Sequence, residues 1–573
     1  LVAVVIPDDV TSIPSHGFQY GCYKVTDLTL PAGVTSIADG AFKGLSSLST
    51  IKLATANTSF VVDDNVLYNK EKTKILCFPQ LRAGDYTIPA TITELGDYQF
   101  YNCVNLTGVT LPNTIKEIPQ YAFAGCAKLS TVTIPASVES ISDYVFNNCT
   151  TLTTLIFADN SKLKTIGLYA FANCTNLTAL TIPASVKTIK DFAFDNCTAL
   201  TNVVIEDSDT PLSLGMGTIY RQQEVTDYDE MGEPMGSWTE DCYFGLFGLS
   251  PLKTLYIGRN LTLTNFSNNN DPMYYSGNYY YLGKGTLTRV EIGSKVTGLP
   301  AGLFRYNTCS INEVNYHGTI TQWCNISFAD ATATPFYCST AILHLKGSPL
   351  HSQVNIPEGA TKIGAYSFYG QRGVSTIIVP STVTTIEPYA FNNGFITEVY
   401  INAKAVISLT NTNSFASNTS IFIVDEAVPA YRADATWSAL TDQIYPKGCL
   451  QVTVELVAMT SSPALLPALN ALERVNGEYR INALTNLKIK GTMNGWDILM
   501  IRTKMPNLRT LDLSEVTILD NDGGYEYYQG YHTTANTISP YSFYNLDNLQ
   551  KVILPQNITT SRSEERFSRN AET

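Results

Sequence analysis

The chain has 573 residues, of which 44% are hydrophobic and 15% charged, a composition that indicates a folded protein with a largely uncharged polar surface. Its 50 acidic residues outnumber the 37 Lys and Arg, and the resulting net charge of −13 excludes the basic footprint that a nucleic-acid-binding protein needs. No apolar run approaches the length of a membrane span, so we expect no transmembrane segment in this chain.

The N-terminal region opens with the apolar run LVAVVIP, which we interpret as a strand of a repeat. The chain has no initiator Met and begins inside this repeat, which predicts a truncated N-terminus and a missing signal peptide. A further copy begins at Leu48, lacks its proline and gives way to an insert over 54–86.

A repeat of 23 residues dominates the segment from Pro89 to Cys197. One copy reads LSTVTIPASVESISDYVFNNC, from Leu129 to Cys149, and Phe and Cys recur at fixed places in each copy, with a single step of 25. A fixed period in this range is the signature of a solenoid, in which each coil buries its apolar face against its neighbours. We expect the repeated Phe and Cys to form the structural core: Phe100, Phe123, Phe146, Phe171, Phe194, Cys103, Cys126, Cys149, Cys174 and Cys197.

Each copy predicts a strand, a short extended segment and one helical turn. Val132 and Ile134 alternate with polar residues as in a half-buried strand, and Pro135 ends that strand because it has no N–H to donate. Val138 and Ile141 form a second inward pair, and the segment 142–149 predicts a single helical turn. Stacked coils would pair their strands in parallel, roughly 5 Å apart.

The repeated cysteines fit a buried, reduced ladder better than a set of disulfides. They occupy one place next to the repeated Phe, on the expected inner side of the turn, where Cys behaves as a small apolar residue. No C-x2-C or H-x3-H spacing occurs, so we expect no zinc site and no other metal.

The outward strand positions predict a flat face of small, nearly uncharged side chains, which offers little to discriminate one ligand from another. Thr is favourable strand material, and this explains most of its frequency. The outward pairs are Thr50/Lys52, Gly108/Thr110, Thr131/Thr133, Thr154/Ile156, Ala179/Thr181 and Asn202/Val204.

Two irregular inserts follow the regular coils, at 206–244 and 266–284. The first is acidic, and its Asp227–Glu233 run opens like a calcium loop, but the twelfth position is Trp238 instead of Glu. The second is rich in Tyr, as is a cluster near residue 528, and Tyr with Asn, Gly and Ser is typical of adaptable binding loops. The candidate ligand-binding residues are Tyr274, Tyr275, Tyr279, Tyr280, Tyr281, Tyr525, Tyr527, Tyr528 and Tyr531.

These tyrosines have an alternative role of about equal weight. The loops could instead cover a sheet edge or pack on the next coil. Inserts in solenoids tend to map to one face, often the binding face, which favours the binding role slightly. The rings could also stack on sugars.

The remaining copies predict two solenoids. Pro357 and Phe368 recur 23 residues later, and the first solenoid extends over 1–404 with a cap at 405–447 that contains a short helix. Residues 448–495 predict a strand and a helix that lead into a second, truncated array over 496–561. The tail, 562–573, abandons the pattern and reads like a translated sequencing adapter, so we exclude it from the fold.

The enzyme signals are weak. His344 and His351 are the only close pair of histidines, and no acidic or Cys partner lies at ligand spacing. No G-x-S-x-G, H-E-x-x-H or phosphate-loop motif occurs. We therefore expect no catalytic residues and no cofactor.

The TIPASV and AFxxC phrases, the VLYNKEKTKIL insert and the segment IFIVDEAVPAYRADATWSALTDQIYP together resemble the BspA-like leucine-rich repeats of bacterial and protist surface proteins. The resemblance covers nearly all of 1–560. It implies a leucine-rich repeat solenoid of mixed α/β, mostly β, character, with one parallel strand per coil. It also implies a non-catalytic role in adhesion.

These observations favour a secreted or cell-surface protein that binds a host or microbial surface protein or glycan through its solenoid and insert loops. A carbohydrate-capturing protein that uses the tyrosines as stacking platforms is an alternative. A non-catalytic arm of a larger secreted enzyme is another, and a purely structural surface-layer role is a third.

Overall fold

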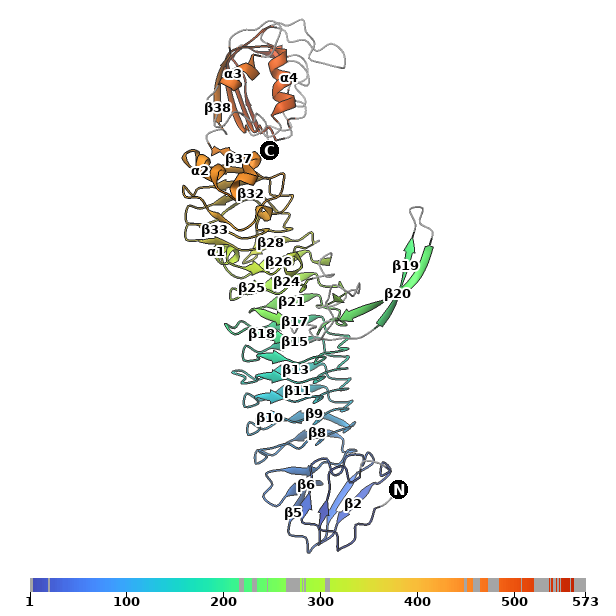
Figure 1. Ribbon diagram of the computed structural model, residues 1–573. Coiled ribbons are helices and arrows are strands. Elements are labelled where there is room, and N and C mark those ends of the chain that lie inside the picture. The colour runs from blue at the N-terminus through green and yellow to red at the C-terminus, as the bar shows by residue number, and fades with distance from the viewer. Residues whose placement is uncertain are drawn as a thin grey trace. The chain divides into compact units, whose positions relative to one another are not determined.

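The protein is described by a computed structural model (Figure 1), and the chain divides into two compact units. The first comprises Leu1–Ser375, Thr385–Ile396 and Leu409–Ala416, and the second Thr376–Thr384, Thr397–Ser408 and Ser417–Thr573. The residues that the structure describes are 4–18, 21–215, 221–228, 234–244, 246–263, 279–280, 282, 285–304, 310–337, 339–447, 451–456, 464–471, 484–505, 508–519, 535, 537–538, 543, 546, 548–556 and 558–560.

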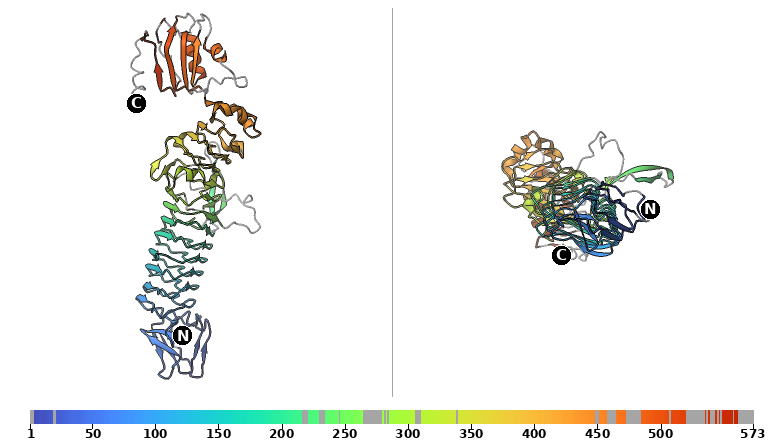
Figure 2. Two further views of the ribbon diagram at one scale, coloured as in Figure 1. Left: turned by 90° about the vertical axis from the view of Figure 1, so that its left-hand side faces the viewer. Right: turned by 90° about the horizontal axis from the view of Figure 1, so that it is seen from below.

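In the first unit, each coil contributes one strand to a parallel face (Figures 1 and 2). These strands are β8 (Gly84–Thr87), β9 (Leu106–Thr110), β11 (Thr131–Ile134), β13 (Thr154–Phe157), β15 (Ala179–Ile182), β17 (Asn202–Ile205), β21 (Thr254–Ile257), β24 (Arg289–Ile292), β26 (Glu313–Tyr316) and β28 (Ile342–Leu345). The predicted leucine-rich repeat solenoid with one parallel strand per coil is confirmed. We call this surface the strand face.

A second row of short strands follows the strand of each coil. It forms one parallel sheet, as the apolar pair Val138 and Ile141 predicted for this part of the repeat. Its members are β10 (Glu117–Ile118), β12 (Ser140–Ile141), β14 (Thr165–Ile166), β16 (Thr188–Ile189), β18 (Leu212–Leu214) and β22 (Leu261–Leu263).

The strand face is interrupted between β13 and β15, which are not hydrogen-bonded neighbours and belong to separate sheets. The interruption coincides with the one regular coil of 25 residues, whose two additional residues lie between β13 and β14. The second row remains continuous here, because Ser140 and Ile141 pair with Thr165 and Ile166.

The predicted helical turn is wrong. Residues 142–149 form a run of turns, because Tyr144 and Asn148 both have a φ of 61°, outside the helical region. The N–H of Tyr144 donates to the carbonyl of Leu168 in the next coil at 2.8 Å, and Asn147 and Cys149 close single turns within the segment, so intercoil bonds alternate with local turn bonds. The same left-handed position recurs at Tyr98, Tyr121, Tyr169 and Phe192.

The repeated Phe and Cys side chains form the core of the regular coils. Adjacent Phe rings from Phe100 to Phe194 stack with centroids 4.8–5.3 Å apart. From Cys126 to Cys197, each repeated Cys donates its S–H to a Phe carbonyl of an earlier coil, as Cys126 Sγ does to Phe100 O at 3.1 Å. Burial raises the pKa of the Cys126 and Cys197 thiols to about 12, and all five repeated cysteines are free and buried.

The N-terminal insert adds a small antiparallel sheet to the stack. The parallel pairing resumes at Gly84 of β8, slightly before the predicted end of the insert at residue 86. The strands of this region are β1 (Ser12–Ile13), β2 (Asp27–Leu30), β3 (Ser36–Ile37), β4 (Thr50–Leu53), β5 (Phe60–Asp63), β6 (Val66–Asn69) and β7 (Ile75–Cys77), of which β5, β6 and β7 form the antiparallel sheet.

The two later inserts leave the solenoid continuous. Within 206–244 the strands β19 (Arg221–Tyr228) and β20 (Pro234–Phe244) form an antiparallel hairpin, and β23 (Tyr279–Tyr280) pairs in parallel with the end of β20. β17 pairs with β21 across the first insert, and β21 pairs with β24 across the second. The stacking therefore tolerates both insertions.

The last coils of the first unit carry a few short elements besides β28. The helix α1 (Ile320–Cys324) begins at a capping box, in which the side chains of Thr319 and Gln322 satisfy backbone N–H groups. The other elements here are β25 (Gly298–Leu299), β27 (Ser327–Phe328), η3 (Ala331–Ala333), β29 (Ser348–Pro349), β30 (Ser352–Asn355), β31 (Lys362–Ile363), β33 (Thr385–Ile386), β35 (Ser408–Leu409) and η4 (Thr412–Ser414).

The second unit contains the predicted cap and the C-terminal array. In the cap, the indole of Trp437 donates to the carbonyl of Ile407 at 2.7 Å and packs edge-on against Tyr431. Within the predicted cap bounds lie β36 (Ser420–Ile423), η5 (Asp425–Ala427), α2 (Val428–Ala433), η6 (Trp437–Gln443) and β37 (Ile444–Pro446), and the strands β32 (Val374–Val379) and β34 (Glu398–Ile401) precede the cap.

The C-terminal array has its own sheet and core. The predicted lead-in strand β38 pairs with β39, which pairs with β40, so residues on both sides of the expected boundary at 496 share one sheet and one apolar cluster. The elements are β38 (Gln451–Leu456), α3 (Leu465–Ala471), β39 (Asn486–Met493), α4 (Gly495–Lys504), β40 (Thr510–Ile518), β41 (Thr537–Ile538), β42 (Lys551–Ile553) and β43 (Thr559–Thr560). The predicted adapter tail lies outside the described residues.

Candidate functional site

Most of the predicted binding tyrosines lie outside the described residues, so their role stays a prediction. Tyr279 and Tyr280 are the exception, and only as the backbone of β23. The other members of the set are Tyr274, Tyr275, Tyr281, Tyr525, Tyr527, Tyr528 and Tyr531.

The strand face of the regular coils is as plain as the sequence predicts. Thr131 and Thr133 are exposed and alternate with the buried Val132 and Ile134. Ile156 is 46% exposed, beside the interruption between β13 and β15. In this region the face presents methyl and hydroxyl groups on short side chains.

The strand face changes character from β21 to β26. Its outward positions carry long polar and aromatic side chains, and the pairing register sets them side by side on adjacent strands. We call this group the polar patch: Asp207, Tyr256, Arg289, Glu291, Glu313, Asn315 and His317.

Glu291 is the centre of the polar patch. Its Oε1 accepts from Arg289 Nε at 2.7 Å, and its Oε2 accepts from His317 Nε2 and from Asn315 Nδ2. Arg289 also reaches Glu313 on β26, at 3.4 Å. Burial alone would raise the pKa of Glu291, but the hydrogen bonds from His317 and Arg289 hold it below its usual value. The carboxylate is therefore fixed and charged.

Tyr256 and Asp207 form a second hydrogen-bonded pair within the patch. The Tyr256 hydroxyl donates to Asp207 Oδ1 at 2.9 Å, and burial together with this bond raises the pKa of the phenol. A Cβ placed on Gly293 would lie 2.3 Å from Asp207 Oδ1 and 2.9 Å from Tyr256 Oη. The absence of a side chain at Gly293 therefore leaves room for the hydrogen-bonded side chains of Asp207 and Tyr256.

The edge of the patch is also ordered by side-chain contacts. The His317 ring lies edge-to-face against Tyr256, with centroids 5.4 Å apart. Lys295 pairs with Asp209 at 2.8 Å, next to the Asp207 loop. The patch thus presents planar donors, planar acceptors and two rings in fixed orientations on an open face.

Sequence reasoning missed the polar patch, although a signal for it exists. Two strands of the patch alternate polar and apolar residues just as the Thr-rich strands do, namely RVEI at 289–292 and EVNY at 313–316. The inserts at 206–244 and 266–284 interrupt the 23-residue period here, so the repeat pattern alone identifies outward positions only as far as Val204.

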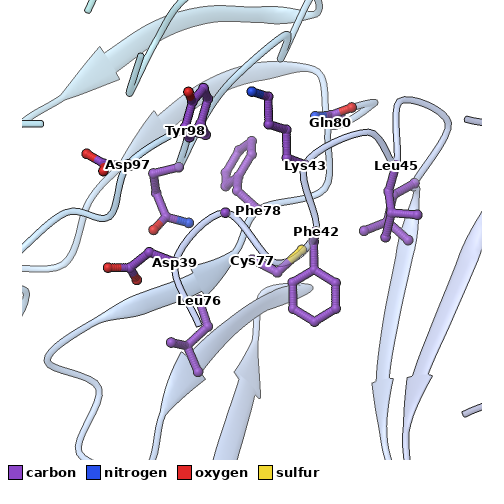
Figure 3. Close-up of a pocket in the computed structure, with 13 residues that line it drawn as sticks. Asp39, Phe42, Lys43, Leu45, Leu76, Cys77, Phe78, Gln80, Asp97 and Tyr98 are labelled. Atoms are coloured by element: carbon purple, nitrogen blue, oxygen red, sulfur yellow. The ribbon is translucent and has the colours of Figure 1, made fainter. Parts of the chain in front are cut away.

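A small pocket lies where the N-terminal insert meets the regular coils (Figure 3). Its volume of about 30 Å³ holds one or two water molecules. Lys43 lines the pocket, with its Nζ 3.6 Å from the centre of the Tyr98 ring, and burial lowers the pKa of this amine. Burial and the neighbouring Asp39 raise the pKa of Asp97 beside it. The pocket is too small for an organic substrate.

The remaining candidates carry no chemistry of their own. His344 Nδ1 lies 3.1 Å from the carbonyl of Ile342, and His351 is exposed at the start of the next coil. Among the described residues, no group of three or more His, Cys, Asp or Glu side chains is placed to hold a metal ion. None of the helices in the described part of the chain has the length and apolar character of a membrane crossing.

The chain matches the description of a BspA type leucine rich repeat region over residues 1–83, 74–201, 256–334, 346–427 and 531–571. It belongs to this family. Comparison with proteins of curated function gave no match.

Several solved structures of bacterial leucine-rich repeat proteins are similar to this chain. One from Eubacterium ventriosum is 28% identical, with 37% of this chain and 56% of that chain covered and a TM-score of 0.34. One from Bacteroides ovatus is 20% identical, with 72% and 88% covered and a TM-score of 0.36. A leucine rich cell surface protein from Faecalibacterium prausnitzii is also 20% identical, with 71% and 84% covered and a TM-score of 0.23. The chain therefore spans little more than half of the first of these.

Proposed function

We propose that this chain is a non-catalytic, secreted or cell-surface protein that binds an extracellular macromolecule, a protein or a glycan, through its solenoid. The polar patch supports this proposal. Six of its members lie on three adjacent strands or directly after them, and hydrogen bonds and an ion pair within the patch hold them in place. Fixed polar side chains on an open face suit recognition of a large ligand.

A binding role fits this geometry better than catalysis does. His317 and Glu291 form a pair of the kind that general bases use, but they lie on the strand face, where His317 is 41% exposed. Acid–base catalysis gains from a site that excludes water around the reacting atoms. The open face offers contact area instead.

The tyrosine-rich inserts are a second part of the proposal. Residues 266–284 connect β22 to β24, next in sequence to two strands of the polar patch. We propose that Tyr274, Tyr275, Tyr279, Tyr280 and Tyr281 extend the binding surface from that side.

The test is binding of the full chain to a panel of immobilised extracellular-matrix proteins and glycans. A variant in which a short Gly/Ser linker replaces 266–284 is measured beside it, and circular dichroism verifies that both are folded. Binding to any member of the panel is the expected result, and weaker binding of the linker variant would support the insert. No binding to the whole panel would contradict the proposed function, and unchanged binding of the linker variant would remove the insert from it.

A further inference from the structure

We infer that the polar patch on β21, β24 and β26 is a binding site for a neutral glycan. This inference rests on the proposed function and deepens it, because it names the ligand class and the residues. It also places recognition on the strand face, independently of the tyrosine-rich inserts.

The hydrogen-bonding groups of the patch suit sugar hydroxyls. A hydroxyl both donates and accepts, so it is best bound by planar side chains that offer a donor and an acceptor side by side. Arg289 and Glu291 stand next to each other in this way. The buried Asn315 supports them, because its Nδ2 donates to Glu291 while its Oδ1 accepts from the N–H of Gly347. Arg289 is 42% exposed and Glu313 is 38% exposed, so both have polar atoms at the surface. Because Arg289 is already paired with both Glu291 and Glu313, a neutral ligand can bind without supplying a counter-charge to this guanidinium.

The rings of the patch suit the apolar side of a sugar. Tyr256 lies half-buried on β21, and His317 stands edge-to-face beside it after β26. The aliphatic C–H groups of a pyranose ring can pack on such rings while its hydroxyls reach the polar neighbours. One ring with flanking polar groups is thus available for at least one sugar unit.

Two glycines show that this arrangement is specifically accommodated. A Cβ on Gly258 would lie 2.5 Å from the backbone N of Asp207, and a Cβ on Gly293 would lie 2.3 Å from its carboxylate. Asp207 can therefore approach this closely because β21 and β24 are each followed directly by a glycine. This close approach brings Asp207 to the Tyr256 hydroxyl.

Other ligand classes fit the patch less well. The core of a protein–protein interface is depleted of charge and carries large apolar anchors. The large apolar side chains exposed in the described part of the chain lie elsewhere, at Val5, Tyr23, Leu81, Val104, Ile156 and Phe395. Nucleic acid is disfavoured by the net charge of −13. A neutral, hydroxyl-rich ligand remains the best match.

The test uses the full chain and soluble cello-, manno-, galacto- and chito-oligosaccharides as probes. Binding is screened on an array of these oligosaccharides and measured by titration calorimetry, and a panel of extracellular-matrix proteins is run beside it. The patch variants are Tyr256→Ala and Glu291→Ala, and the matched controls are Thr133→Ala and Thr154→Ala on the plain part of the strand face. Thermal melts verify that all variants are folded.

We expect at least one oligosaccharide to bind, and each patch variant to weaken that binding about tenfold or more while the controls leave it unchanged. The conservative variant Tyr256→Phe keeps the ring and should lose less than Tyr256→Ala. Oligosaccharide binding that the patch variants do not alter would overturn the inference. Binding to matrix proteins alone would also overturn it but would leave the proposed function standing, whereas no binding to either panel would contradict both.

Discussion

The coils at 89–205 and those at 254–345 share one architecture but differ in what they present. Both stack in parallel with apolar residues inward, as Val132 and Val290 do. The first group presents short side chains such as Thr131 and Thr133, whereas the second presents a hydrogen-bonded group around Glu291. Coil stacking restrains the inward positions, and the outward positions of the strands are free to carry recognition.

The core of the regular coils should be the most sensitive part of the molecule. Phe123 is fully buried and stacks on Phe100 and Phe146. We expect Phe123→Ala to lower the free energy of unfolding by about 3–5 kcal/mol, because it leaves a cavity between two rings. Chemical denaturation measures this. The matched change Thr133→Ala on the outward side should cost less than about 0.5 kcal/mol, and equal losses in the two variants would refute the inward–outward contrast.

The coil that carries β21 uses a buried arginine where an N-terminal coil uses an asparagine. Arg259 is fully buried and donates to the carbonyls of Pro183, Ala184 and Val186, as Asn57 does to two equivalent carbonyls. We expect Arg259→Ala to cost about 3 kcal/mol, since it leaves buried carbonyls without donors.

Arg259→Lys is a useful second variant, because the single amine of lysine cannot reach the carbonyls of Pro183, Ala184 and Val186 at once. It should fall between the wild type and Arg259→Ala in a denaturant titration. A stability loss below about 0.5 kcal/mol for Arg259→Ala would show that the guanidinium is dispensable to this coil.

The packing of the polar patch can be broken at Gly293 without removing any polar group. Gly293→Ala places a methyl group against Asp207 and the backbone of Gly258. We expect a loss of about 1–2 kcal/mol in unfolding free energy from this overpacking, together with weaker oligosaccharide binding. Gly84→Ala makes a useful comparison for added bulk, because nothing lies within 4 Å of its Cβ position, although its φ of +89° adds strain. Unchanged binding in Gly293→Ala would separate the Asp207–Tyr256 pair from recognition.

The charge network of the patch should have a smaller, pH-dependent effect. The pKa of Glu291 is held below its usual value, so its ionisation stabilises the folded state at a pH above the unfolded pKa of about 4.3. We expect Glu291→Gln to cost about 0.5–1 kcal/mol near neutral pH, since the network is partly exposed. The difference from the wild type should shrink as the pH falls through the folded pKa. If the difference in unfolding free energy between the two proteins instead grows as the pH falls, the proposed stabilisation by the ionised Glu291 is wrong.

The stacking architecture could be predicted from the sequence because it depends on repeated inward residues. The period of the Phe and Cys positions, the proline that follows several of the strands and the alternation at Val132–Ile134 each encode one local constraint. The helical turn was mispredicted because Tyr144 lies in a left-handed conformation that its sequence neighbours do not signal. Its cause is a hydrogen bond to the following coil, which is a long-range contact.

The candidate site was harder to predict than the fold. The polar patch joins Asp207, Tyr256, Glu291 and His317, which are separated by inserts of irregular length. Their proximity follows from strand register, and register can be assigned only once the inserts are known to leave the stack. The amino-acid composition instead predicts binding residues in the tyrosine-rich inserts, and the role of those residues stays a prediction.

Hydrogen–deuterium exchange of the full chain, with and without the best-binding oligosaccharide, tests the central claim most directly. We predict slower exchange of backbone amides in 254–258, 289–293 and 313–317 when the oligosaccharide is bound, and unchanged exchange in 131–134. Protection confined to 266–284, or to the Thr-rich strands, would contradict the assignment of recognition to the polar patch.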